Sequence, residues 1–143
     1  MGCIARLIRS FVSILLVVAC LLSGILWNLR ADRKSAELVE MLTADAESWE
    51  IFLDESITGG AADTESAEEL ISGYGRLVQE VEYISEYSGI YLVMHHMFPT
   101  KDGLLLSYEE IEAVPMEQNT GECIEALPAD TEFSIYRLQY YWD

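Results

Sequence analysis

The chain begins with a long run of apolar residues. Over residues 10–27 no side chain is ionisable except that of Cys20, and nearly every other residue is aliphatic or aromatic. At about 1.5 Å per residue this run forms a helix of about 27 Å, close to the thickness of a bilayer core. Trp27 lies where an interfacial aromatic residue is expected, with Arg30 beyond it. The pattern predicts a transmembrane anchor over residues 10–29.

Two other interpretations of this segment stay open. A cleaved secretory signal needs a small-x-small site, which Leu22-Ser23-Gly24 supplies only in part. The run Val17-Val18-Ala19-Cys20 resembles a bacterial lipobox, and this resemblance implies that Cys20 becomes the lipidated first residue of the mature chain. We expect an uncleaved anchor, because apolar residues continue beyond both sites.

Beyond the anchor the apolar residues follow the period of an α-helix. Over residues 35–57 they recur every three or four positions, at Leu38, Leu42, Ala46, Trp49, Leu53 and Ile57. This spacing predicts an amphipathic helix that ends at Thr58-Gly59-Gly60. Nothing between Trp27 and Ser35 forces a break, so we expect the transmembrane helix to continue into it.

A second helix is predicted from Ser66 to about Tyr87. Ser66 and Glu69 have the spacing of a capping box. The apolar residues that follow also recur every three or four positions, at Leu70, Tyr74, Leu77, Val81 and Ile84. Gly73 and Gly75 disfavour a regular helix, so a kink or split is expected there.

After Gly89 the period of the hydrophobic pattern changes to two, and runs of β-branched and aromatic residues are bounded by turn signals. This pattern predicts strands over residues 90–98, 104–114, 123–127 and 131–142, with a hairpin connection at residues 99–103. Helices followed by three or four such strands predict an α+β fold with an antiparallel β-meander.

The charge is divided along the chain in the same way as the hydrophobic pattern. The net charge of −17 combines +4 from residues 1–34, which hold five cations and one acid, with −21 from residues 35–143, which hold 24 acids and three cations. No basic surface is available to bind nucleic acid, so we expect no nucleic-acid partner. We therefore predict a short basic tail over residues 1–9, the anchor over 10–29, and an acidic extracytoplasmic α+β domain over 30–143.

The orientation of the anchor depends on a nearly even distribution of cations. Arg6 and Arg9 precede the apolar run, whereas Arg30, Arg33 and Lys34 follow it. The short leading tail resembles the start of a signal anchor, which favours a cytoplasmic amino terminus in the cell membrane.

One short stretch carries candidate metal-ligating chemistry. Met94, His95, His96 and Met97 offer the thioether and imidazole groups that bind copper. On a regular strand Met94 and His96 share one face, and His95 and Met97 share the other, so at most two of them converge on one ion. A metal site would need help from acids or from Cys123, whereas packed or edge-exposed histidines need none.

Catalytic patterns are absent from the sequence. It contains no HExxH, CxxC or GxSxG motif, and its two histidines are adjacent. Cys123 is the only cysteine after the anchor, so we expect a small buried hydrophobe rather than a reactive thiol or an intermolecular disulfide. We predict a non-enzymatic protein without a cofactor.

These observations favour a single-pass membrane protein that presents a binding or assembly domain to a protein partner or to its own copies. The layout also resembles that of type IV pilins and pseudopilins, which implies a filament or secretion-apparatus subunit. Ser10 stands where that family's processing motif has glycine before Phe11, and Leu15 stands where the family has glutamate. Extracytoplasmic copper binding through Met94 to Met97 is a third hypothesis.

Overall fold

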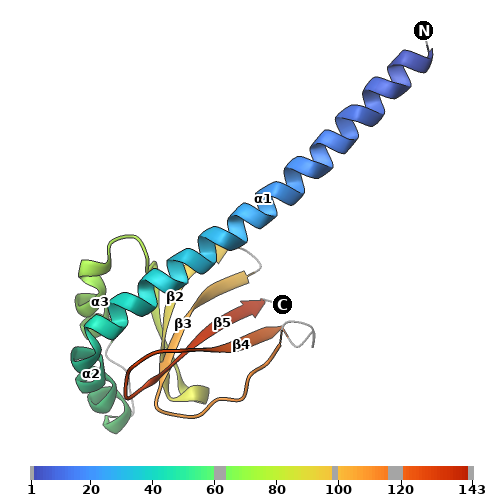
Figure 1. The fold of residues 1–143 in the computed structure, drawn as a ribbon. Helices are drawn as coiled ribbons and strands as arrows, with labels where there is room; N and C mark the ends of the chain where they lie inside the picture. Colours follow the sequence, from blue (N-terminus) through green and yellow to red (C-terminus); the bar gives the residue numbers. More distant parts are fainter. Residues whose placement is uncertain (1, 60–63, 98–99, 116–120, 142–143) are drawn as a thin grey trace. The chain divides into compact units, whose positions relative to one another are not determined.

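The computed structural model describes residues 2–59, 64–97, 100–115 and 121–141 (Figure 1). The chain divides into two compact units, Met1–Arg33 and Lys34–Asp143. The second unit combines helices with a five-stranded antiparallel sheet, so the predicted α+β fold is confirmed.

The helix α1 runs from Gly2 to Ala44 without interruption. Every side chain over residues 3–30 is exposed, although most of them are apolar. Residues 34–44 of the same helix belong to the second unit, where Leu38 and Leu42 are completely buried. The prediction that the apolar helix continues into an amphipathic one is therefore confirmed.

The amphipathic segment consists of two helical pieces rather than one. α1 ends at Ala44, Asp45 forms a turn, and α2 runs from Ala46 to Thr58. The apolar spacing continues across the turn, so it gives no sign of the break. α2 ends as predicted: the backbone N–H of Gly59 donates to the carbonyl of Glu55 at 3.0 Å, and Gly60 lies outside the described residues.

The predicted second helix is wrong beyond its first half. α3 runs from Thr64 to Ile71 and is followed by the 3₁₀ helix η1, Ser72–Tyr74. Gly75 then adopts a φ of +62°, a conformation that side-chain-bearing residues rarely accept, and the helical course stops there. Residues 80–84 form the strand β1, Glu80–Ile84, and a second 3₁₀ helix, η2, covers Ser85–Tyr87.

The sheet contains five strands, one or two more than predicted. β2 spans Gly89–Met97, β3 Thr100–Ser107, β4 Glu122–Leu127 and β5 Ser134–Tyr141. All neighbouring strands are antiparallel in the order β1-β2-β3-β5-β4. The sheet is therefore not a simple meander, because β5 lies between β3 and β4.

The predicted second strand is displaced toward the amino terminus. β3 starts at Thr100, inside the predicted hairpin connection, and ends at Ser107 rather than at Val114. Residues 98–99 lie outside the described residues. The acidic stretch after β3 is irregular and exposed, and Val114 forms an isolated bridge with Ile124 of β4.

Both faces of the sheet are apolar at their centres. On the first face α2 and α3 lie against the sheet (Figure 1), and the buried cluster contains Leu42, Trp49, Leu92, Leu104 and Ile135 among others. On the second face a smaller cluster contains Tyr91, Val93, Leu105, Ile124, Tyr136 and Leu138, with Ile111 and Val114 packed against it.

Candidate functional site

α1 carries the largest exposed apolar surface of the described residues. It is the one described helix that is long and apolar enough to cross a membrane, and its most apolar stretch is not buried. A membrane anchor and a signal sequence both have these properties. Cys20, the residue that would be lipidated in the lipobox alternative, lies exposed within this segment.

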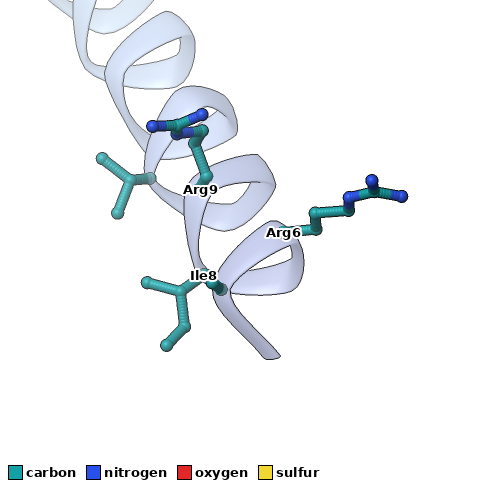
Figure 2. A pocket seen from close by; sticks show the side chains of 5 residues that line it. Arg6, Ile8 and Arg9 are labelled. Atoms are coloured by element: carbon teal, nitrogen blue, oxygen red, sulfur yellow. The ribbon is translucent and has the colours of Figure 1, made fainter. Parts of the chain in front are cut away.

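Two arginines lie on the first turns of α1. Figure 2 shows that Arg6 and Arg9 project to different sides of the helix, with Ile8 close by. They line a shallow groove together with Ala5 and Val12. All of its lining residues come from one helix, so the groove is open and does not enclose a ligand. Cations beside an apolar helix suit the headgroup region of a bilayer.

The predicted metal residues lie at the end of β2. Met94 is completely buried in the cluster that faces α2 and α3. His95 is half-buried and lies opposite Asp102, His96 is exposed and lies opposite Lys101, and Met97 lies opposite Thr100.

The register between β2 and β3 shifts between Val93 and His95, which shows a β-bulge there. The bulge breaks the regular alternation of side chains. Met94 and His96 therefore lie on different faces, and the prediction that they share one is wrong. His95 instead joins Met94 on the first face, because its partner Asp102 lies two residues from Leu104.

No group of three or more histidine, cysteine, aspartate or glutamate residues is arranged to hold a metal ion within the described ranges. Copper binding through Met94 to Met97 stays a prediction. His95 and His96 lie opposite different residues of β3, Asp102 and Lys101.

The register also assembles a polar row across four strands. His95 of β2 lies opposite Asp102 of β3, Asp102 opposite Gln139 of β5, and Gln139 opposite Cys123 of β4. Cys123 is half-buried rather than buried as predicted. Because neighbouring strands lie about 4.8 Å apart, the row separates Cys123 from His95 by about three strand spacings.

Asp102 is held by Arg137 of β5 in a bidentate pair. Arg137 Nε donates to Oδ1 at 3.2 Å, and Nη2 donates to Oδ2 at 3.1 Å. The two side chains are only 17% and 14% exposed, so water screens the pair weakly. Neither residue was a candidate from the sequence, because they are 35 positions apart and only the strand register brings them together.

On the second face Lys101 joins β3 to β1. Its Nζ donates to Oε1 of Glu82 and, at 3.5 Å, to Oε2 of Glu80. Burial of the ammonium group lowers its pKa, but the hydrogen bond and charge of Glu82 and then Glu80 outweigh this effect and raise the pKa overall. Lys101 therefore keeps its charge and neutralises part of the acid on β1.

Tyrosines and acids form a second polar group on this face. Tyr87 donates to Oε1 of Glu122 at 2.8 Å. The rings of Tyr91 and Tyr140 meet edge to face, with centroids 5.8 Å apart. Burial raises the pKa of both Tyr87 and Tyr140. The next cause is the hydrogen bond to Glu122 for Tyr87 and the negative charge of Glu122 for Tyr140. These phenols stay protonated at neutral pH, where Tyr87 acts as a hydrogen-bond donor that joins η2 to β4.

Two cations of the sheet, Lys101 and Arg137, thus form cross-strand pairs with acids. Such pairs stabilise strand register and leave the surface predominantly acidic. The chain matches no protein-family model, no curated protein and no solved structure.

Proposed function

We propose that this chain is a single-pass membrane protein that displays a small, acidic, non-catalytic binding or assembly domain outside the cytoplasmic membrane. The exposed apolar surface of α1 carries the proposal. Its large side chains are mostly about half exposed or more, including Leu16 at 62% and Leu21 at 62%. An apolar surface of this extent needs a bilayer or another apolar partner to remove it from water.

The distribution of charge supports the same assignment. Arg6 and Arg9 lie at one end of the apolar segment, and Arg30 and Arg33 lie at the other, where both sets reach the interfaces of a bilayer. No acidic residue precedes Asp32. The acidic unit repels anionic headgroups and so remains available to a partner in solution.

The second unit supports a binding role rather than a catalytic one. Two of its cations, Lys101 and Arg137, pair with acids of the sheet. Their charges are therefore used within the domain, and the displayed surface is negative. A cationic protein surface is the partner that such a domain attracts.

Membrane extraction tests the proposal directly. We expect the full-length chain to stay in the membrane fraction after alkaline carbonate washing and to dissolve in detergent. The double substitution Leu16→Arg with Leu21→Arg should release it, because each arginine costs about 2.5 to 3.5 kcal/mol at the centre of a membrane helix. Glu47→Arg, at an exposed position of α2, is the control and should remain membrane-bound. Release of the unaltered chain by carbonate would overturn the proposal.

A pilin-like assembly subunit is the second candidate. It is favoured by one helix, α1, that carries the exposed apolar segment and also supplies Leu38 and Leu42 to the core of a domain with an antiparallel sheet. The mature amino terminus separates the cases. Met1 supports an anchor, Phe11 supports a processed pilin-like subunit, and an acylated Cys20 supports a lipoprotein.

A further inference from the structure

The two edge strands of the sheet, β4 and β1, differ in whether another segment pairs with their outer side. At the β4 edge, Val114 exchanges two backbone hydrogen bonds with Ile124, at 3.0 and 2.9 Å, so an irregular segment covers this edge. β1 forms the opposite edge, and in the described part of the chain no strand pairs with its outer side. An edge with no paired strand presents a row of backbone N–H and C=O groups to a further strand.

β1 also carries a regular pattern of charge. Val81 and Tyr83 belong to the cluster that faces the helices, whereas Glu80, Glu82 and Ile84 point to the second face. The side chains of Glu80 and Glu82 are 47% and 32% exposed. Lys101 contacts both of these acids and carries one positive charge against their two, so the edge keeps a negative charge.

We propose that the outer edge of β1 binds an extended, basic segment of a partner protein, which adds one strand to the sheet. Main-chain hydrogen bonds supply affinity in this mode, and alternate side chains supply selectivity. Lysine or arginine at every second position of the segment would lie beside Glu80 and Glu82. This inference names the partner class of the proposed binding domain and in that sense rests on the proposed function.

A second copy of the chain fits this edge poorly. Two β1 strands side by side would bring the Glu80 and Glu82 carboxylates of both copies onto neighbouring strands, where like charges repel. Acidic residues on an edge strand also prevent promiscuous pairing with apolar strands. The charge therefore selects a basic segment.

Peptide binding to the full chain in neutral detergent micelles tests the inference. The probe is a fluorescein-labelled peptide of alternating lysine and valine, and its dissociation constant is measured by fluorescence anisotropy. A fully N-methylated version keeps the charges and lacks every N–H donor. We expect the unmethylated peptide to bind, the methylated peptide to lose binding about tenfold or more, and amide hydrogen exchange in residues 80–84 to slow when the unmethylated peptide binds.

Two substitutions locate the site. Glu80→Lys should weaken binding about tenfold, whereas Glu109→Lys, at an exposed position outside the sheet, should change it less than about twofold. If Glu80→Lys disturbs folding, Glu80→Gln should still weaken binding by about threefold. The inference would be overturned if neither peptide binds or if both bind equally. It would also be overturned if the Glu80 and Glu109 substitutions have equal effects, or if amide hydrogen exchange in β1 does not change. The carbonate extraction described above is unaffected by these outcomes and tests the membrane assignment separately.

Discussion

The hydroxyl of Tyr74 donates a hydrogen bond to Oδ2 of Asp45 at 2.8 Å. It also accepts one from the indole Nε1 of Trp49 at 2.9 Å. Asp45 is the turn between α1 and α2, Trp49 lies on α2, and Tyr74 lies on η1. Because Trp49 is completely buried and Tyr74 is 5% exposed, this chain of hydrogen bonds attaches the exposed helix junction at Asp45 to the core.

Tyr74→Phe should destabilise the domain. The substitution leaves the indole N–H of Trp49 without this acceptor and removes the donor to Asp45, which should cost about 1 to 3 kcal/mol of the free energy of unfolding. Urea unfolding of the full chain in micelles, followed by circular dichroism, measures the change. Tyr141→Phe is the control at an exposed position of β5, and an equal loss there would contradict the role of the Tyr74 contacts.

Alkaline pH should weaken the fold through Tyr74. Burial raises its pKa to about 12; Trp49 counteracts this effect and Asp45 adds to it. In the unfolded chain a tyrosine ionises near pH 10. The folded state therefore keeps a proton that the unfolded state loses, so the stabilisation is complete below about pH 10 and decreases as pH rises toward 12.

Urea unfolding at a series of pH values from about 9 to 11 measures this dependence. Tyr74→Phe should show a shallower decline, because phenylalanine does not titrate. The raised pKa of Lys101 acts in the same direction in both proteins, so part of the decline should remain. Identical slopes for the two proteins would exclude Tyr74 as a source of the pH dependence.

Lysine should not fully substitute for Arg137 in its pair with Asp102. Arg137→Ala leaves a largely buried carboxylate without its bidentate partner, which should cost about 2 to 4 kcal/mol. Arg137→Lys keeps the charge but not the forked geometry, so it should recover only part of the loss. Arg76→Ala, at an exposed position before β1, is the matched control. Combining Arg137→Ala with Asp102→Asn should give a smaller loss than the sum of the two single losses, because both remove one interaction.

The elements that were predicted correctly are those whose hydrophobic periodicity fits only one type of secondary structure. β2, β4 and β5 were expected within a few residues of their bounds, because β-branched and aromatic residues alternate between turn signals. β1 was missed because Leu77, Val81 and Ile84 have helical spacing, whereas Glu80, Val81, Glu82 and Tyr83 alternate with period two. A short segment can satisfy both periods, and here the pairing with β2 determines the outcome.

The polar contacts of the sheet depend on register, which local patterns do not contain. Asp102 and Arg137 meet because β5 lies beside β3. In this strand order β4 pairs with the other side of β5. The β-bulge at Met94 likewise separates it from His96, although regular alternation predicts a shared face. The long apolar helix, by contrast, was recognisable from residues 10–27 alone, because length and apolarity are properties of one segment.

Gly103 should be the glycine of the sheet that least tolerates a side chain. A Cβ atom there would lie 2.8 Å from Cε2 of Tyr91 and closer still to the carbonyl oxygen of Leu92, and both residues belong to the neighbouring strand β2. A carbonyl oxygen within a strand ladder cannot move aside alone, so Gly103→Ala should separate β2 from β3 and cost about 1 to 3 kcal/mol.

Gly73→Ala is the matched control, because a Cβ atom at that position meets nothing within 4 Å. It should be neutral or stabilise by up to about 1 kcal/mol through the unfolded state. Urea unfolding of both variants measures these effects, and a neutral Gly103→Ala would show that β2 and β3 do not pack as closely as this register requires.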